Sequence, residues 1–402
     1  MIVGVDASNL GPGGSMTHLA NLLAAARPHE HGITRFVVWG GRAHLARLPE
    51  QRWLDKVAVP ALDRGLVPRV LWQRFRLPAL ARAACDVLFV PGGSASAGFR
   101  PVVTMSRNML PFEWAELRRY GLSWMTLRLV LLRFGQARTF RRADGLIFLT
   151  EYARAAVARV ARLPARVTVI PHGVEERFRI EPREQHPLTA YSVSRPMRAV
   201  YVSNIEFYKH QWHVARAVAT LRATGLPIAI DFVGPAYAPA LARLQATLRE
   251  LDPERAFLHY RGAVPFAKLH ELLREADLFV FASSCENMPN VLLEGMAAGL
   301  PIACSMRGPL PEVLGGAGVT FDPERPDDIA RALGALAEDA ALRRRCAEAA
   351  AVRATAFTWD RCAQQTLSFI AATAQSARAR LHRGTRPDAL ETLEADNVER
   401  SS

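Results

Sequence analysis

Cysteine is scarce in this 402-residue chain, and no two cysteines have the spacing of a metal site. None of them forms a C-x-x-C pair, which argues against a zinc site or a disulfide framework. With no secretory segment in view, this cysteine usage is typical of a protein kept in a reducing cytosol. The five cysteines are Cys85, Cys285, Cys304, Cys346 and Cys362.

Long hydrophobic runs and several common motifs are also missing. The first residues, MIVGVDASNL, have neither the basic segment nor the long apolar core of a signal peptide. No uninterrupted run of about 20 apolar residues predicts a transmembrane helix. No DxD-type carboxylate cluster indicates a bound metal ion, and aromatic residues are not spaced as a nucleic-acid stacking platform. We therefore expect a cytoplasmic, metal-independent protein without a cofactor and without a nucleic-acid partner.

Positive charge is distributed unevenly. Residues 1–190 hold 27 Lys and Arg against 14 Asp and Glu, whereas the remainder holds 24 of each, so the net charge of +13 lies entirely in the first half. A basic domain beside a neutral one predicts an anionic partner, for which nucleic acid and an anionic membrane surface are the two candidates.

Two segments of the basic half combine arginine with large apolar residues. A basic amphipathic helix with Trp on its apolar side suits an anionic membrane interface. The alternative is a helix that buries its apolar side in the core. The charge asymmetry favours peripheral contact with the inner face of the cytoplasmic membrane. The large apolar residues are Trp72 and Phe75 in residues 64–82, and Trp124, Leu127, Leu131 and Phe134 in residues 118–142.

Short apolar runs alternate with Ala/Leu/Arg-rich helical patterns along the whole chain. This β-α-β series predicts an α/β fold with parallel sheets covered on both faces. We expect domains at residues 1–185 and 186–365, a helix at 366–384 and a disordered polar tail at 385–402. The predicted strands are Ile2–Val5, Phe36–Trp39, Val87–Val90, Val102–Met105, Leu146–Leu149, Val167–Ile170, Ala199–Val202, Ile228–Val233, Ala256–Tyr260, Leu278–Phe281 and Pro301–Ala303.

The segment FASSCENMPNVLLEGMAAGLPIACS carries the clearest chemical pattern. It predicts a buried strand, a polar loop containing Glu286, and a helix that begins after Pro289 and ends at Gly299. Ligands of open α/β sheets bind at this end of the strands. The free amides of the first helical turn suit a phosphate. Glu294 can accept hydrogen bonds from a ribose diol, and Glu286 would then face the sugar beyond the diphosphate; the alternative is that both are solvated charges.

This segment resembles the E-x7-E motif of the retaining glycosyltransferases of family 4, which have the GT-B fold. Seven residues separate Glu286 from Glu294, and the small residues and Gly-x-Pro that follow also fit. The resemblance implies two Rossmann-like domains that face a central cleft, with a C-terminal helix that returns to the first domain. It implies that Glu286 contacts the donor sugar, that Glu294 binds the ribose, and that the nucleotide sugar also meets Asn287, Met288, Asn290 and Val291.

Other segments extend the resemblance over most of the chain. YVSNIEFYKHQ is similar to the segment where the family carries an Arg and a Lys for the donor diphosphate. Lys209 stands at the Lys position, whereas Asn204 replaces the Arg. Arg261, Arg307 or Arg107 would have to compensate for the lost charge. Gly234 and Gly262 close two further strands where the backbone passes near the nucleotide.

The first half contributes a glycine turn and a strand-end loop. Gly13 and Gly14 follow a strand and precede a helix, an arrangement that lets backbone amides approach a phosphate or forms a bare tight turn. The loop Ser106–Asn108 carries Arg107, a candidate for catalysis beside Glu286 and Lys209. Many relatives have a His in this loop. Here His18 and His172 are the nearest by segment, and both can equally be structural; Glu151 is similarly ambiguous.

Together, the motifs and the resemblance predict a retaining hexosyltransferase that uses a GDP- or UDP-sugar. We expect its acceptor to be a saccharide or lipid-linked saccharide in bacterial cell-surface polysaccharide synthesis. Three alternatives stay open. They are a nucleotide-sugar epimerase on the same fold, a non-catalytic basic membrane- or nucleic-acid-binding protein, and an inactive relative marked by Asn204.

Overall fold

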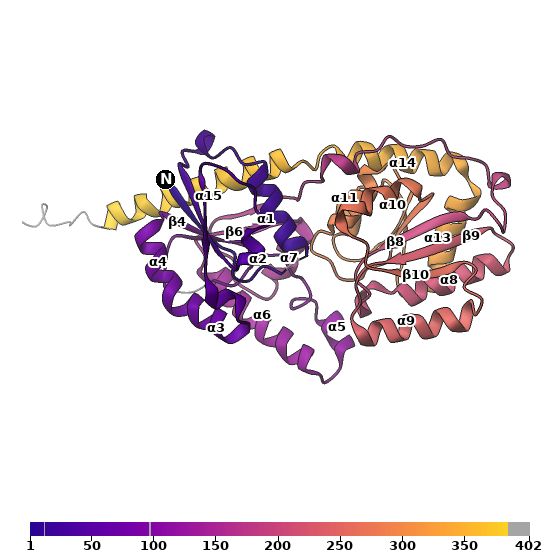
Figure 1. Cartoon of the computed structure of the whole chain (residues 1–402), viewed down its shortest axis with the longest axis horizontal. Coiled ribbons are helices and arrows are strands. Elements are labelled where there is room, and N and C mark those ends of the chain that lie inside the picture. Colours follow the sequence, from indigo (N-terminus) through magenta and orange to yellow (C-terminus); the bar gives the residue numbers. More distant parts are fainter. Residues whose placement is uncertain (12, 96–97, 385–402) are drawn as a thin grey trace, which may run out of the picture.

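The computed structural model describes residues 1–11, 13–95 and 98–384, and shows two α/β domains side by side along the long axis of the molecule (Figure 1). Each domain has one parallel sheet with helices on both faces. The predicted tail at 385–402 lies outside the described residues.

The first sheet has seven strands, and all of its strand pairs are parallel. Its central strands are short runs of buried apolar residues, as a sheet covered on both faces requires. The strand order reverses direction between β1 and β4, and ligands of such sheets bind beside that point. In spatial order the strands are β3 (Leu54–Ala58), β2 (Arg35–Gly40), β1 (Ile2–Asp6), β4 (Val87–Val90), β5 (Val102–Met105), β6 (Gly145–Phe148) and β7 (Val167–Val169).

Seven α-helices connect and cover these strands in the described part of the first domain. A π-helical stretch, Trp72–Arg76, joins the third to the fourth. The helices are α1 (Gly14–Ala24), α2 (Arg42–Leu45), α3 (Leu66–Leu71), α4 (Leu77–Ala84), α5 (Trp114–Leu117), α6 (Trp124–Arg142) and α7 (Glu151–Ala158).

The second sheet repeats the same winding with six strands, all in parallel pairs. In spatial order they are β10 (Leu258–Gly262), β9 (Ile228–Val233), β8 (Met197–Val202), β11 (Leu278–Phe281), β12 (Ile302–Ser305) and β13 (Val319–Phe321). Its helices are α8 (Gln211–Ala223), α9 (Ala238–Leu251), α10 (Leu269–Glu275), α11 (Asn290–Ala297), α12 (Leu310–Leu314), α13 (Pro326–Glu338) and α14 (Ala340–Ala354).

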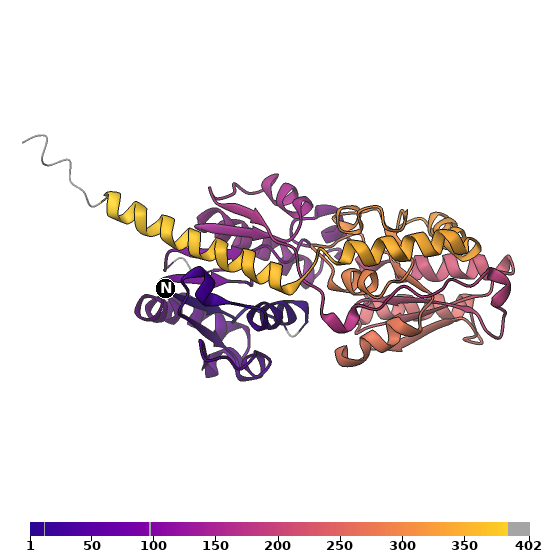
Figure 2. The same ribbon diagram turned by 90° about the horizontal axis from the view of Figure 1, so that it is seen from above.

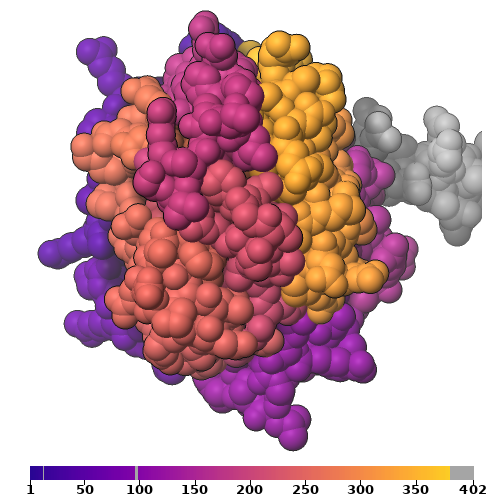
Figure 3. Space-filling view, turned by 90° about the vertical axis from the view of Figure 1, so that its right-hand side faces the viewer, coloured from indigo at the N-terminus to yellow at the C-terminus, as the bar shows by residue number. Residues whose placement is uncertain are grey.

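The chain crosses between the domains twice. The stretch from about Arg177 to Met197 has weak periodicity and contains Pro, which predicts an interdomain linker. Its residues 179–196 run over the outer surface of the second domain (Figure 3). There the fully buried Arg343 side chain binds Gln185 and the His186 carbonyl. The last helix, α15 (Trp359–Gly384), then returns along the first domain, as predicted (Figure 2). Gly145 at the start of β6 makes room for it, because a Cβ there would lie 2.8 Å from the Phe369 ring.

Candidate active site at the junction of the two domains

The carboxyl ends of both sheets meet where the domains touch. Asn287, in the loop after β11, joins them directly. Its side-chain amide donates to the Ser106 carbonyl after β5 at 2.9 Å, and its own carbonyl accepts from the Thr150 hydroxyl after β6 at 3.1 Å. Asn287 is therefore a contact between domains, with its side chain turned to the first one.

The loop after β11 is shaped by its own serines and by the loop after β8. The Ser283 hydroxyl donates to the Cys285 carbonyl at 3.2 Å, and the Ser284 amide donates to the Tyr208 carbonyl at 2.8 Å. The Ser284 hydroxyl also pairs with His210 at 2.8 Å. These bonds hold the loop after β11, which carries Glu286, against the loop after β8, which carries Lys209.

Glu286 and Lys209 form an ion pair that is largely removed from water. The two side chains are 14% and 9% exposed, respectively. The Lys209 ammonium also lies 4.7 Å from the centre of the Phe281 ring, and the Tyr201 hydroxyl donates to the Lys209 carbonyl at 2.6 Å. A buried pair of this kind contributes little net stability compared with packed apolar residues, so stability alone does not account for it.

Glu294 lies in α11 and is 6% exposed. No described residue donates a hydrogen bond to its carboxylate. Burial, and to a smaller extent the nearby Glu175, raises the pKa of Glu294 to about 8 against the opposing effect of Arg177. A buried carboxyl without donors is suited to receive hydroxyl groups from a ligand.

The N-termini of α1 and α11 approach each other across the junction. A Cβ on Gly14 would lie 3.7 Å from the side-chain nitrogen of Asn290. Gly13 and Pro289 precede these helices, and neither helix has a side-chain cap on its first amides. Two uncapped N-termini that face one another provide free N–H groups and positive dipole ends for an anion.

Arg107 lies beside the N-terminus of α1. Its guanidinium donates to the Gly14 carbonyl at 3.1 Å and pairs with the His18 ring. His18 and His172 are buried beneath it, with ring centres 4.7 Å apart. Burial, followed by the charge of Arg107, holds both histidine pKa values well below the usual range. Both rings are therefore neutral at physiological pH and support Arg107 from the core.

Some of the other residues expected to contact the nucleotide sugar are packed in the structure, and others are exposed. Gly234 has φ +145°, and a Cβ there would lie 2.0 Å from the Ser203 carbonyl oxygen, so close packing of the backbone accounts for this glycine. Gly262 has φ +71°, which favours glycine. The Asn204 side chain is exposed beside Ser203. Met288 accepts a hydrogen bond from the His172 amide through its sulfur at 3.3 Å, whereas Val291 follows in the first turn of α11.

Two of the arginines expected to compensate for Asn204 are held by carboxylates. Arg261 donates to Asp231 in β9 at 3.1 Å, and Arg307 donates to Asp322 at 2.9 Å. Arg107 has no carboxylate partner among the described residues, which leaves it the best placed of the three.

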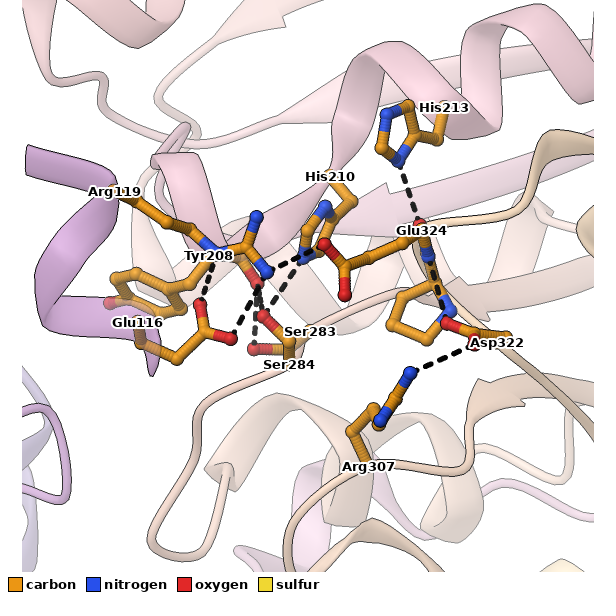
Figure 4. A network of polar contacts seen from close by, with 11 residues as sticks. Glu116, Arg119, Tyr208, His210, His213, Ser283, Ser284, Arg307, Asp322 and Glu324 are labelled. Carbon is orange, nitrogen blue, oxygen red and sulfur yellow. Dashed lines mark hydrogen bonds and ion pairs between the residues drawn. The ribbon is translucent and has the colours of Figure 1, made fainter. Parts of the chain in front are cut away.

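A polar network on one side of the junction, drawn in Figure 4, was not found from the sequence. Arg119 reaches from the first domain to Glu324 of the second at 2.7 Å, while it also holds Glu116 of its own domain at 2.7 Å. In the same view, Arg307 pairs with Asp322, and His213 contacts the Pro323 carbonyl at 2.9 Å. The contacts of Arg119 with Glu324 and of His213 with Pro323 join residues 205 and 110 positions apart, so no local sequence motif predicts them.

Glu312 makes a second bridge that sequence reasoning missed. Its two carboxylate oxygens accept hydrogen bonds from the Glu151 and Tyr152 amides at 2.8 and 2.9 Å. The second domain thus supplies an anion to the N-terminus of α7. The Glu151 carboxylate pairs with Arg154 on the surface of that helix, so Glu151 contacts the second domain through its backbone amide.

Comparison with known families decides what kind of protein has this site. Residues 12–178 match Glycosyltransferase Family 4, and residues 192–353 match Glycosyl transferases group 1. The chain belongs to glycosyltransferase family 4. The two matches fall on the first and second sheets in turn.

Similar proteins include two bacterial mannosyltransferases. A stretch of 121 residues is 32% identical to the O-antigen chain mannosyltransferase B of Escherichia coli, and covers 30% of this chain and 32% of that protein. A stretch of 249 residues is 27% identical to a Mycobacterium tuberculosis GDP-mannose-dependent phosphatidylinositol dimannoside mannosyltransferase, and covers 61% of this chain and 62% of that one. The chain thus spans from about a third to three fifths of these relatives' lengths.

Solved structures confirm the predicted GT-B fold. The Anabaena protein HepE, in a complex with UDP-glucose, superposes with a TM-score of 0.67 over 94% of this chain and 100% of that one at 18% identity. WaaG, a glycosyltransferase of lipopolysaccharide biosynthesis, superposes with a TM-score of 0.65 over 92% and 99% at 16% identity.

Proposed function

We propose that this family 4 chain is a retaining glycosyltransferase that moves a hexose from a GDP- or UDP-sugar to a saccharide or lipid-linked saccharide. The observation that carries the proposal is the buried Lys209–Glu286 pair in the loops before α11, together with the buried Glu294 in that helix. In this proposal Lys209 is the cation for the diphosphate, Glu294 accepts hydrogen bonds from the ribose, and Glu286 faces the sugar, near the free amides of α11. Those are the groups that a nucleoside diphosphate sugar needs.

The donor's diphosphate would lie between the N-termini of α1 and α11. Lys209, Arg107 and the free amides would balance its charge, so no metal ion is required for that purpose. The ribose hydroxyls would donate to Glu294. Glu286 would accept hydrogen bonds from the hexose and fix its orientation.

Transfer would then replace one bond to the anomeric carbon by another. The acceptor hydroxyl attacks from the face that the diphosphate leaves, so the configuration is retained. The bond from the anomeric carbon to the diphosphate oxygen breaks, a new glycosidic bond forms, and the hydroxyl proton passes to the departing diphosphate. Arg107 and Lys209 stabilise the negative charge that develops on the leaving group.

A role in cell-surface polysaccharide synthesis is supported by the kinds of relatives found. The Escherichia coli relative acts on O-antigen chains, and the mycobacterial relative acts on a lipid, according to their names. Both are mannosyltransferases, so GDP-mannose is the first donor to test.

The decisive experiment incubates the protein with GDP-mannose, UDP-glucose and dTDP- and ADP-sugars, and follows release of the nucleotide and formation of a glycoside. Glu286→Gln should bind the nucleotide with near-normal affinity but reduce turnover at least a hundredfold, since it removes charge from the sugar site. Asp231→Asn, outside the site, serves as a matched control. Near-normal turnover in Glu286→Gln would contradict the assignment.

The same experiment separates the alternatives. An epimerase would release a changed nucleotide sugar and no glycoside. Such an enzyme needs an acid and a base at the sugar, whereas the two buried histidines are packed beneath Arg107. An inactive relative would bind nucleotide and release nothing.

A further inference from the structure

The outer face of α3 and α6 exposes an unusual number of large apolar side chains. Phe75, in the π-helical stretch that continues α3, is 66% exposed, and Trp124 and Phe134 of α6 are 74% and 68% exposed. Figure 1 shows both helices on the same side of the first domain. The other exposed apolar residues of these helices are Leu66, Val67, Val70, Leu71, Leu127 and Leu131.

In α6 the exposed apolar residues form a stripe that the core does not use. Residues 124, 127, 131 and 134 share one face of the helix, because their spacing follows the helical repeat. The buried residues Leu129, Gln136 and Phe140 lie on the opposite face. The stripe continues toward the C-terminus with two arginines at the same spacing, Arg138 and Arg142.

Trp72 corrects part of the sequence prediction. It was expected on the membrane-facing side, but it is only 8% exposed and packs in the core of the first domain with Trp39 and Leu77. The chain enters a π-helical turn at Trp72, which directs this residue inward. Phe75, three residues later, points outward.

A cavity of about 510 Å³ lies between the two helices. Arg74 from the α3 side, Arg138 and Arg142 from α6, and Arg100 line it. Arg100 is paired with Asp144 at 2.6 Å, whereas the other three have no carboxylate partner among the described residues. The cavity therefore combines three uncompensated guanidinium groups with apolar rims on both sides.

The two segments that form this face carry charge of one sign only. Residues 64–82 and 118–142 together contain 12 arginines and no Asp, Glu or Lys. A guanidinium group can donate two parallel hydrogen bonds to two oxygens of one phosphate. Arginines beside exposed Trp and Phe side chains suit an anionic bilayer: the arginines match its headgroups, and the aromatic side chains match its upper acyl region.

We propose that the face of α3 and α6 docks on an anionic phospholipid membrane, with one lipid phosphate held in the arginine-lined cavity. The Trp124–Phe134 stripe and Phe75 enter the upper acyl region. In the described residues no helix is long and apolar enough to cross a bilayer, so the contact is peripheral. A nucleic acid is a poorer partner for this face, because its grooves and backbone offer no apolar region that could cover the exposed Trp, Phe and Leu side chains.

The same geometry gives the docking an orientation. Helix α6 has 19 residues and is therefore about 28 Å long; its C-terminal part lines the cavity and Trp124 lies at its other end. Just before Trp124, Arg119 and Tyr120 contact Glu324 and Glu206 of the second domain. The stripe therefore leads from the cavity to the domain junction and would place that junction close to the membrane surface.

Vesicle flotation tests the docking. Wild-type protein should float with vesicles of phosphatidylcholine and phosphatidylglycerol, stay unbound with phosphatidylcholine alone, and dissociate in high salt. Trp124→Ser with Phe134→Ser should abolish flotation. Val352→Ser, which removes a 71% exposed residue from the second domain, should have no effect. Circular dichroism checks that each variant is folded; wild-type flotation that is absent, or equal on both vesicles, overturns the proposal.

A second pair of variants tests the cavity against diffuse charge. Arg138→Gln with Arg142→Gln should weaken vesicle binding more than about 25-fold, since each basic residue near an anionic surface contributes about fivefold. Arg128→Gln with Arg141→Gln removes the same charge from the same helix outside this cavity. Equal losses in the two pairs overturn the headgroup site. Stabilisation by inorganic phosphate without vesicle binding would point to a soluble phosphate ligand and overturn the membrane.

Discussion

Replacing Glu294 by Gln should make the protein more stable at alkaline pH. The folded-state pKa is about 8, against an ordinary value of 4.5, and burial is the main cause. Below pH 4.5 the carboxyl is protonated in both folded and unfolded chains. Between pH 4.5 and 8 the unfolded chain releases this proton while the folded chain keeps it, so the free energy of unfolding falls as pH rises.

The size of this effect follows from the two pKa values. Each tenfold difference in proton affinity corresponds to about 1.4 kcal/mol, so the ionised Glu294 costs the fold about 5 kcal/mol once pH exceeds 8. The difference in unfolding free energy between Glu294→Gln and wild type should therefore grow by roughly this amount between pH 4.5 and pH 8.5. Thermal and urea unfolding across that range measure it.

A control and a second readout sharpen the test. Glu348→Gln serves as the control, because it makes the same replacement at an exposed site of the same domain. At pH 7 a group with this pKa is about nine tenths protonated. If ribose hydroxyls donate to an ionised Glu294, nucleotide binding should release a proton, and its calorimetric enthalpy should vary with the buffer. A pH-independent difference for Glu294→Gln would refute the reasoning.

Three further predictions concern charge at the junction. Lys209→Met should destabilise the second domain by about 3–5 kcal/mol in urea unfolding, because it leaves the Glu286 carboxylate buried and unpaired; Lys209→Met with Glu286→Gln should recover most of this loss. Glu312→Ala removes the anion at α7 and should weaken the domain contact by about 1–2 kcal/mol, seen as a larger radius of gyration in small-angle scattering; an unchanged radius would contradict this. EDTA should leave transfer activity unchanged, whereas loss restored by a divalent ion would show a metal requirement.

Elements marked by local sequence signals were predicted closely. The strand at Leu278–Phe281 and the helix that begins at Asn290 lie where the apolar run, Pro289 and Gly299 placed them. The strand at Leu54–Ala58 was missed, since it is an edge strand whose half-exposed residues show no buried run. The three-residue strand at Val319–Phe321 was missed for the same reason: its pairing with β12 defines it, not its own pattern.

The site was predicted less completely than the fold. The pairing of Glu286 with Lys209 joins two loops that were located because each follows a recognisable strand. What the sequence could not give was the set of contacts between domains, since Glu312 and Tyr152 are 160 positions apart and Arg119 and Glu324 are 205 apart. Such pairs follow from the relative placement of two folded domains, which no local pattern encodes.

The charge balance of the site connects these findings. In this structure Lys209 neutralises Glu286, and each would be costly to bury alone. A diphosphate that draws Lys209 toward itself would leave Glu286 free, and the hydroxyls of the hexose are the donors able to satisfy it. Neither half of the nucleotide sugar would then bind as well alone as both do together. Free hexose should therefore bind weakly unless the nucleotide is present, and a calorimetric titration of mannose with and without GDP would measure that coupling directly.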